Sequence, residues 1–202
     1  MVRFPRATHR NIYVQSLRAG QRVMASVVRF LEQNLRLRVN REKSAVAPVQ
    51  ERKFLGYRLL LNGKMGIAPK SLERAKDRIR QITRRHRGVS LAQVIVELNR
   101  FLKGWFQYYR LAAFRGDLQR MDAWIRRKLC CFRLKQRKRG KSIATFLQRL
   151  GVPADQPWRI ASSGKGWWRL ALSPPVKRAM SKEWFSQQEL VPLLSRYDAL
   201  HG

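Results

Sequence analysis

The chain has 202 residues, a length that accommodates one or two compact domains and excludes a large multidomain assembly. Hydrophobic residues make up 45% of it, including 6 Trp, 9 Phe and 5 Tyr, which argues against a disordered chain. The 44 Lys and Arg residues outnumber the 12 Asp and Glu residues so strongly that the net charge is +32. Such an excess predicts a polyanionic partner, and nucleic acid is the foremost candidate.

A membrane surface is the alternative partner of so basic a chain. No uninterrupted apolar run is longer than about four residues, whereas a spanning helix needs roughly 20. The basic segment 1–10 also lacks the apolar stretch of a secretory signal. We therefore expect no membrane partner and a location inside the cell.

Cys130 and Cys131 are adjacent and would point in different directions from a helix, which predicts a buried or inert pair.

The first stretch of the chain, residues 1–68, carries a net charge of +11. Asn11–Val14 is short and β-prone, which predicts a strand, and Arg18–Asn34 has the apolar spacing of an amphipathic helix. Phe54–Leu61 ends at Asn62-Gly63, a favoured two-residue turn, and the following residues to Ala68 can return as a second strand. We expect a strand, a helix and a β-hairpin in this order.

The middle stretch, residues 69–140, is the electrostatic centre with a net charge of +16. Three amphipathic helices are predicted here. The first opens at Pro69 with Ser71 as its capping residue, and the second begins at a capping box formed by Ser90–Gln93. The third is capped by Asp117 and leads into a basic cluster.

The last stretch, residues 141–202, is less basic, at +5. It predicts a short helix over Ile143–Leu150, a segment punctuated by Pro and Gly over Gly151–Gly166, and another helix introduced by Ser173. The expected fold is mainly α with a small β portion. A three-helix bundle follows the short strand, helix and hairpin, and an irregular helical tail completes the chain.

Catalytic and metal-binding patterns are missing from the sequence. Its 12 acidic residues are scattered singly, and Asp117 and Asp122 would not share a helical face, so a two-metal site is not expected. Gly140-Lys141-Ser142 resembles the end of a phosphate-binding loop, but Lys135 stands where the loop requires glycine. The histidines are also far from other ligand-forming side chains: His9, His86 and His201. We expect no catalytic residue, no metal and no cofactor.

Basic helical faces interleaved with aromatic residues predict a nucleic-acid-binding surface instead. Arginine outnumbers lysine, and its planar guanidinium can contact phosphate and stack on bases, which favours structured RNA over DNA. The predicted contacts are the basic residues of the three central helices: Arg74, Arg78, Arg80, Arg84, Arg85, Arg126, Arg127, Lys128, Arg137, Lys138 and Arg139.

Three motifs carry a family resemblance that spans about residues 12–135. Leu37–Ser44 and Phe54–Tyr57 resemble the late palm of group II intron reverse transcriptases. Leu98–Tyr109 resembles the core of the maturase, or X, domain that forms the thumb of those proteins. Beyond this range, Gly166–Arg169 and Ser173–Pro175 are similar to the tail of bacterial members that lack an endonuclease domain.

The resemblance implies a truncated palm remnant over 1–68, a thumb-like maturase domain over 69–140 and a basic, aromatic extension over 141–202. Lys43 would lie near template or incoming nucleotide, and a primer-grip strand would contain Phe54, Leu55, Gly56 and Tyr57. The maturase motif would contain Gly104, Trp105, Tyr108 and Tyr109. Without the resemblance, we would expect Lys43 to be a solvent-exposed lysine in a turn. We would expect the aromatic residues of both motifs to belong mainly to the hydrophobic core.

One departure from the family is decisive for activity. In the family, paired aspartates that hold the catalytic metals precede a segment like Asn11–Val14, and here Ala7–Arg10 occupy that place. Fingers and most of the palm would also be missing. Because phosphoryl transfer without metal-binding carboxylates loses its main charge stabilisation, we do not expect this chain to polymerise DNA by itself.

The favoured function is a maturase-type protein that binds structured group II intron RNA, with an RNA–DNA duplex as a further candidate ligand, and assists folding and splicing. We expect it in the bacterial cytoplasm, associated with the nucleoid or a ribonucleoprotein. Three alternatives remain open. The chain could be part of a split RNA-directed DNA polymerase whose palm a second chain completes, a decayed gene product, or a generic DNA binder.

Overall fold

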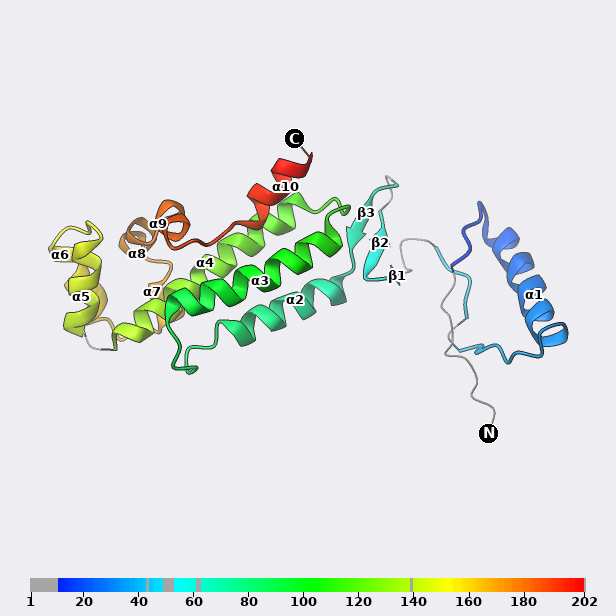
Figure 1. Cartoon of the computed structure of the whole chain (residues 1–202), viewed down its shortest axis with the longest axis horizontal. Coiled ribbons are helices and arrows are strands. Elements are labelled where there is room, and N and C mark those ends of the chain that lie inside the picture. The colour runs from blue at the N-terminus through cyan, green and yellow to red at the C-terminus, as the bar shows by residue number, and fades with distance from the viewer. Residues whose placement is uncertain (1–10, 43, 49–52, 61–62, 139, 202) are drawn as a thin grey trace. The chain divides into compact units, whose positions relative to one another are not determined.

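The computed structural model describes residues 11–42, 44–48, 53–60, 63–138 and 140–201, and it is mainly helical with one small sheet (Figure 1). The chain divides into two compact units, Met1–Ala68 and Pro69–Gly202. The predicted class, mainly α with a small β portion, is therefore confirmed. None of the helices among these residues combines the length and the hydropathy that crossing a bilayer requires.

In the first unit, helix α1 spans Leu17–Gln33, close to the predicted helix. Ser16 caps it, because its side-chain oxygen accepts the backbone N–H of Ala19 at 3.2 Å. Gly20 is the buried residue of α1, and a Cβ there would lie 2.6 Å from Cγ1 of Val46. A glycine is thus required where segment 44–48 approaches the helix.

The strand predicted over Asn11–Val14 is wrong, because these residues have no regular secondary structure and no strand among the described residues pairs with them. A strand forms only when a second strand takes up its hydrogen-bonding groups. The side chains of Ile12 and Tyr13 are each 60% exposed, so an apolar, β-prone sequence did not suffice.

The sheet has three antiparallel strands in the order β1-β2-β3, which span Lys53–Phe54, Tyr57–Leu59 and Met65–Ile67. The predicted hairpin is the β2–β3 pair, in register Arg58 to Gly66. The first predicted strand is interrupted, however, by a tight turn at Leu55 and Gly56, with φ of 51° and 82°. Leu55 adopts a left-handed conformation that non-glycine residues rarely take, which the sequence pattern did not indicate.

In the second unit, three long helices form the predicted bundle, and α3 packs against both α2 and α4 (Figure 1). They span Pro69–Ile82, Leu91–Tyr109 and Arg115–Arg137. Their facing side chains form an apolar core in which the following residues are at most 1% exposed: Ile79, Ile82, Val94, Ile95, Leu98, Leu102, Leu118, Ile125, Leu129 and Leu134.

The predicted caps of these helices have different outcomes. The capping box is confirmed: Ser90 Oγ accepts the N–H of Gln93 at 3.2 Å, and Gln93 Oε1 accepts the N–H of Ser90 at 3.0 Å. Ser71 and Asp117 are not caps, because α2 begins at Pro69 and α4 at Arg115, two residues earlier in each case. Both residues lie inside the first helical turn, where Asp117 still suits the positive end of the helix dipole.

The tail forms short helices that cover α4. Helix α5 confirms the helix predicted over Ile143–Leu150 and begins three residues earlier, at Gly140. Helix α8 starts after Ser173 as expected, and α6 shows that the predicted irregular segment 151–166 contains a helix. Helices α5, α7 and α10 pack against α4, and α6 packs against α5. The bounds from α5 to α10 are Gly140–Arg149, Asp155–Ala161, Trp167–Leu170, Pro174–Ala179, Lys182–Gln187 and Leu193–His201.

Candidate nucleic-acid interface

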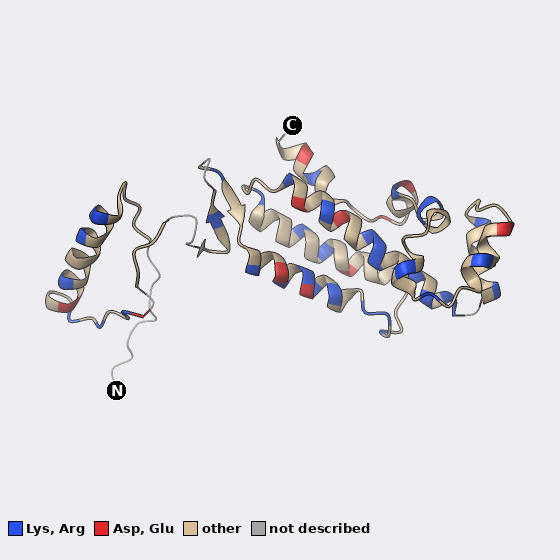
Figure 2. Cartoon of the chain, turned by 180° about the vertical axis from the view of Figure 1, so that it is seen from behind, with Lys and Arg blue, Asp and Glu red and all other residues tan. Residues whose placement is uncertain are grey.

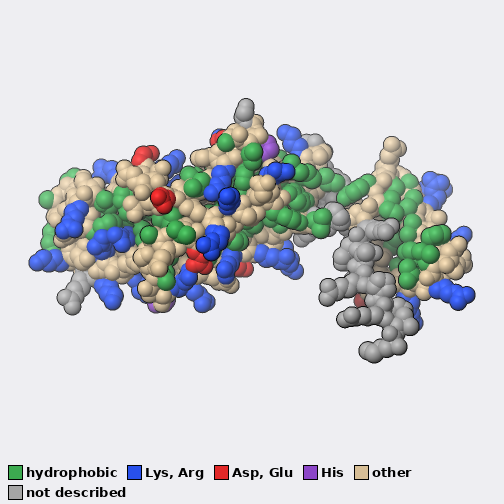
Figure 3. Space-filling view, viewed as in Figure 1, with side chains coloured by type: hydrophobic (Ala, Val, Ile, Leu, Met, Phe, Trp, Pro, Cys, Tyr) green, Lys and Arg blue, Asp and Glu red, His purple; other side chains and the backbone are tan. Residues whose placement is uncertain are grey.

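Basic residues occur on all three helices of the bundle, and a few acidic residues lie among them on each helix (Figure 2). On the face shown in Figure 3, Lys and Arg side chains lie apart from one another, with hydrophobic and neutral surface between them. The contribution of each cation to a binding surface therefore depends on whether the protein already neutralises it.

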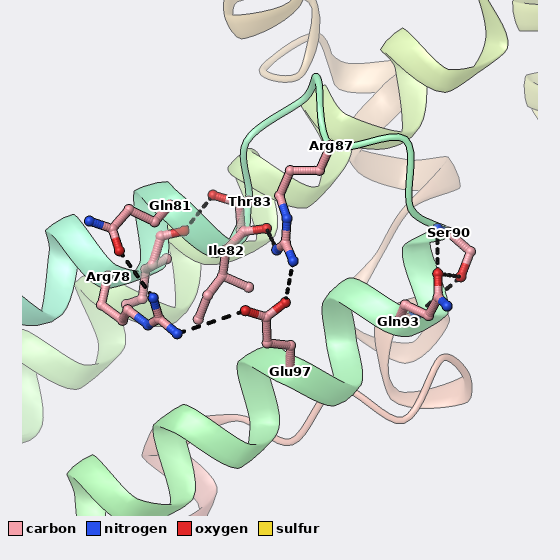
Figure 4. A network of polar contacts seen from close by, with 9 residues as sticks. Arg78, Gln81, Ile82, Thr83, Arg87, Ser90, Gln93 and Glu97 are labelled. Atoms are coloured by element: carbon pink, nitrogen blue, oxygen red, sulfur yellow. Dashed lines mark hydrogen bonds and ion pairs between the residues drawn. The ribbon is translucent and has the colours of Figure 1, made fainter.

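Arg78 on α2 and Arg87 in the following loop share one carboxylate, that of Glu97 on α3. Glu97 lies 2.7 Å from Nη2 of Arg87 and 4.0 Å from Nη2 of Arg78 (Figure 4). Arg87 also donates to the carbonyl oxygen of Ile82 at 2.7 Å, and Arg78 donates to Gln81 at 3.1 Å. Arg78, a predicted RNA contact, is thus partly neutralised within the protein.

Acidic neighbours also hold Arg80. Its Nη1 donates to Asp77 and lies 3.5 Å from Glu73, and these two residues precede it by one and two turns of α2. In the described part of the chain the other predicted arginines of this region form no ion pair, and all are exposed: Arg74, Arg84 and Arg85. These three keep their full charge for a ligand.

Trp124 on α4 brings the basic residues of two helices together. The Arg80 guanidinium lies 5.6 Å from the centre of its ring, and Nζ of Lys128 lies 5.3 Å from it. Both distances suit cation–π attraction. Burial lowers the pKa of Lys128, and the positive charges of Arg80 and Arg85 lower it further. Positive charges therefore lie close to Lys128, although Asp77 and Glu73 partly neutralise Arg80. An anionic ligand would relieve the remaining repulsion.

Arg127 continues this surface toward α7. Its guanidinium lies 3.6 Å from the ring centre of Trp168, and its Nε and Nη2 donate to the carbonyl oxygen of Trp168 at 3.1 and 2.8 Å. Arg127 thus holds α7 on α4, while Trp168 keeps 41% of its surface exposed. We call the following set the basic–aromatic face: Arg80, Arg85, Trp124, Arg127, Lys128 and Trp168.

The structure does not bring the consecutive predicted contacts Arg126, Arg127 and Lys128 to one place. Successive helical residues point about 100° apart. Arg126 lines a cavity of about 140 Å³ together with Leu194 and Ser195 of α10, away from the partners of Arg127 and Lys128. The three residues therefore serve two different sides of α4.

The basic cluster at the end of α4 is also divided. The guanidinium of Arg137 lies 4.5 Å from the ring centre of Phe146 on α5, so this residue is half-buried. Lys138 is exposed at the end of the helix, and Arg139 lies outside the described residues. Arg133, which was not predicted as a contact, lies over the same ring at 5.2 Å.

The residues of the maturase motif lie near the end of α3. Tyr109 is buried, Trp105 is half-buried and packs against it with ring centres 5.2 Å apart, and Tyr108 is 53% exposed. Trp105 also packs edge-on against Phe114 at 5.9 Å. Trp105 and Tyr109 are thus core residues, as expected without the family resemblance, whereas Tyr108 lies at the surface. A contact of this motif with RNA stays a prediction. Gly104 is exposed and has open space beside it.

The other predicted site residues belong to the first unit. Lys43 lies outside the described residues. Phe54 and Tyr57 pair across the β1–β2 turn that Leu55 and Gly56 form, so this segment is a turn flanked by strands and not one continuous strand. A role of these residues in gripping a primer stays a prediction.

Titratable residues form no metal centre in the part of the chain that the structure describes, where no three His, Cys, Asp or Glu side chains converge. His86 contacts Nζ of Lys135 at 2.9 Å, and His201 contacts the carbonyl oxygen of Arg110 at 2.9 Å.

Both cysteines are free and buried, and burial raises the pKa of Cys130 to about 12. The expected buried pair is confirmed.

Comparison with known proteins identifies one segment of this second unit. Residues 72–151 match the family model of the group II intron, maturase-specific domain. The matched segment runs from the first turn of α2 past the end of α5, and it contains most of the basic–aromatic face and the motif around Trp105. No curated protein matches the chain. The maturase-like part of the predicted resemblance is thereby supported, and it extends beyond the boundary expected at residue 140.

Two residues of the basic–aromatic face were not among the predicted contacts, Trp124 and Trp168. Trp124 had a usable signal, because it precedes Lys128 by four residues and so shares its helical face. Trp168 lies in the motif Gly166–Arg169, but the sequence did not indicate its contact with Arg127, since that contact joins residues 41 positions apart.

Proposed function

We propose that the helical unit is a maturase-type RNA-binding domain, which binds structured group II intron RNA and helps that RNA reach its splicing-competent form. The match of residues 72–151 to the maturase-specific domain carries the proposal. In this proposal the RNA supplies the splicing chemistry, and the protein contributes binding alone.

The basic–aromatic face supports the proposal on physical grounds. Arginine and lysine side chains contact phosphates, and exposed indole rings stack on unpaired bases. Trp168 is exposed enough for such stacking, and Arg85 forms no ion pair within the described residues that would compete with a phosphate. The positive charges close to Lys128 repel one another, so an anionic ligand that relieves this repulsion should bind more tightly.

The test is the affinity of the chain for a folded group II intron RNA, against duplex DNA and a scrambled RNA of equal length, at several salt concentrations. We expect the intron RNA to bind most tightly, by a margin that survives rising salt, because contacts beyond counterion release are made. Equal affinities that fall together with salt would overturn the proposal. A splicing assay with the same RNA then measures whether binding raises the spliced fraction.

Paired variants locate the surface. Arg84→Ser/Arg85→Ser should weaken intron binding and reduce the slope of log K against log salt by about 0.7 to 0.9 for each phosphate that the variant no longer neutralises. The control Arg100→Ser/Lys103→Ser removes two exposed charges from α3. Arg84 and Arg85 lie in the loop after α2, which ends at Ile82. If both double variants weaken binding equally, the basic–aromatic face is wrongly assigned.

A further inference from the structure

Four basic side chains and one aromatic ring lie along the last turns of α4 and one face of α5. A shallow depression there is lined by Arg137, Lys141, Ser142, Thr145, Phe146 and Arg149. Four of these, from Ser142 to Arg149, are spaced three, four and seven residues apart and so share one face of α5. Arg133 approaches the same ring of Phe146. The depression combines cations and hydroxyl groups and includes no carboxylate from the described residues.

Two arginines of α4 lie close to each other and have buried Nε–H groups without hydrogen-bond partners in the described part of the chain. Arg133 and Arg137 both lie over Phe146, with guanidinium carbons 5.2 and 4.5 Å from its ring centre. Burial and the neighbouring charge of Arg137 lower the pKa of Arg133. Within the described residues the Nε atoms of both are buried and have no hydrogen-bond partner. Buried donors without partners are costly, as are like charges without a counterion.

Arg133 has one side-chain partner, because its Nη1 donates to Oε1 of Gln136 at 3.3 Å. The unpartnered Nε–H groups of both arginines favour a binding role for the cluster beside its packing role. A guanidinium that only packed on Phe146 would direct its N–H groups to water or to a carboxylate, since arginine carries five donors and no acceptor. Here three further donors line the same depression: the ammonium of Lys141 and the hydroxyls of Ser142 and Thr145. Such a set suits a tetrahedral anion with several acceptor oxygens, and arginine binds phosphate through its paired N–H groups.

We propose that this depression binds one phosphodiester group of an RNA backbone, as a second contact point separate from the basic–aromatic face. The proposal rests on the proposed function for its ligand, because the chemistry of the depression itself defines only a phosphate. The motif Gly140-Lys141-Ser142 takes part through the side chains of Lys141 and Ser142, and not as a nucleotide-binding loop.

The site is tested through the arginine Nε–H resonances, which nuclear magnetic resonance observes directly in the ¹⁵N-labelled chain. Arg133→Lys and Arg137→Lys variants assign the two resonances. Inorganic phosphate should shift both in a saturable way, and a short single-stranded RNA should shift them at far lower concentration. The same RNA with neutral methylphosphonate linkages should not shift them, which separates a backbone phosphate from base contacts.

Variants make the result specific. Lys141→Ser/Arg149→Ser removes two exposed cations of the depression, and Arg100→Ser/Lys103→Ser removes two exposed cations of α3. The first should weaken phosphate and RNA binding at least tenfold, and the second should leave the phosphate-induced shifts unchanged. An unaltered thermal midpoint shows that each variant is folded.

The outcomes separate this site from the proposed function. If inorganic phosphate and RNA leave both Nε–H resonances unmoved, the phosphate site is wrong, even where the chain binds intron RNA through the basic–aromatic face. If phosphate shifts the resonances but the chain prefers no RNA, the site exists and the proposed function fails. Equal shifts in wild type and in Lys141→Ser/Arg149→Ser would also overturn the site.

Discussion

The carboxylate of Asp122 on α4 accepts the backbone N–H of Leu193, 71 residues further along the chain, at 3.0 Å. Its second oxygen accepts the N–H of Leu194, also at 3.0 Å. These two amides belong to the first turn of α10, where helical N–H groups have no partner within the helix. A residue of the bundle thus caps a helix of the tail, and the contact ties the C-terminal helix to α4.

Replacing Asp122 with Ala should lower the free energy of unfolding by about 2 kcal/mol, because one buried and one partly buried N–H donor lose a charged acceptor. Chemical denaturation of wild type and variant measures the difference. Asp117→Ala is the control, since its exposed ion pair with Arg120 should contribute less than about 1 kcal/mol. Equal destabilisation of the two variants would contradict the capping role.

The same residue predicts a pH dependence. Burial raises the pKa of Asp122 above its ordinary value of 3.8, although the two N–H donors act in the opposite direction. A carboxyl whose pKa is higher in the folded state binds more protons when folded. The stability it contributes is therefore fully present below about 3.8 and is lost as pH rises through the folded pKa.

The comparison that isolates this effect uses Asp122→Asn, which cannot ionise. Relative to this variant, wild type should be more stable at about pH 3.5 than at about pH 7, because only wild type carries a buried charge at neutral pH. Thermal midpoints at several pH values give the difference. A wild-type advantage that grows with pH would mean that the hydrogen bonds to the carboxylate outweigh its burial.

The buried thiols give a simpler prediction. Burial raises the pKa of Cys130 to about 12, and it also raises the pKa of Cys131, whose Sγ contacts the carbonyl oxygen of Trp167 at 3.3 Å. Because the thiolate is the reactive species, neither residue should react with a disulfide reagent at about pH 8 while the chain is folded. Both should react once denaturant is added. Rapid labelling of the folded chain would contradict the burial of the pair.

The bundle could be predicted because its signals are local. Apolar spacing placed the helices, and the capping box at Ser90–Gln93 fixed where α3 begins. Ser71 and Asp117 misled because the residues favoured at a cap are also tolerated in the first turn. The strand at Asn11–Val14 failed for a different reason, since a strand depends on a partner that its own sequence does not specify.

The surface was less predictable than the fold. Composition indicated a polyanion-binding protein, but it could not show that Arg78 is paired with Glu97 while Arg85 is not. It also could not show that Arg127 lies on Trp168, because that contact follows from how the tail folds back on α4. Which cation stays available is decided by packing between distant segments.

A variant of Glu97 tests whether this carboxylate competes with RNA phosphates for Arg78 and Arg87. Glu97→Gln removes the carboxylate that Arg78 and Arg87 share, so RNA affinity should rise by about two- to fivefold. Stability should fall by about 1 kcal/mol or less, since the pair is partly exposed. Glu183→Gln is the control, because it removes one exposed carboxylate from α9. Equal increases in affinity for both variants would show that only net charge matters.

Lys128 gives the basic–aromatic face a signature that depends on pH. Its pKa is lowered by burial and by the charges of Arg80 and Arg85, so it loses its proton at a lower pH than an ordinary lysine. Phosphates of a bound RNA favour the charged form and raise the pKa again. Binding at alkaline pH should therefore take up protons, and affinity should fall as pH rises through the lowered pKa.

Calorimetry in buffers of different ionisation enthalpy measures this proton uptake. Lys128→Arg keeps the positive charge but does not titrate in the same range, so its binding should take up fewer protons and keep its affinity at alkaline pH. Lys103→Arg is the matched control on α3 and should behave as wild type. Proton uptake that persists in Lys128→Arg would mean that the RNA does not contact the basic–aromatic face around Trp124.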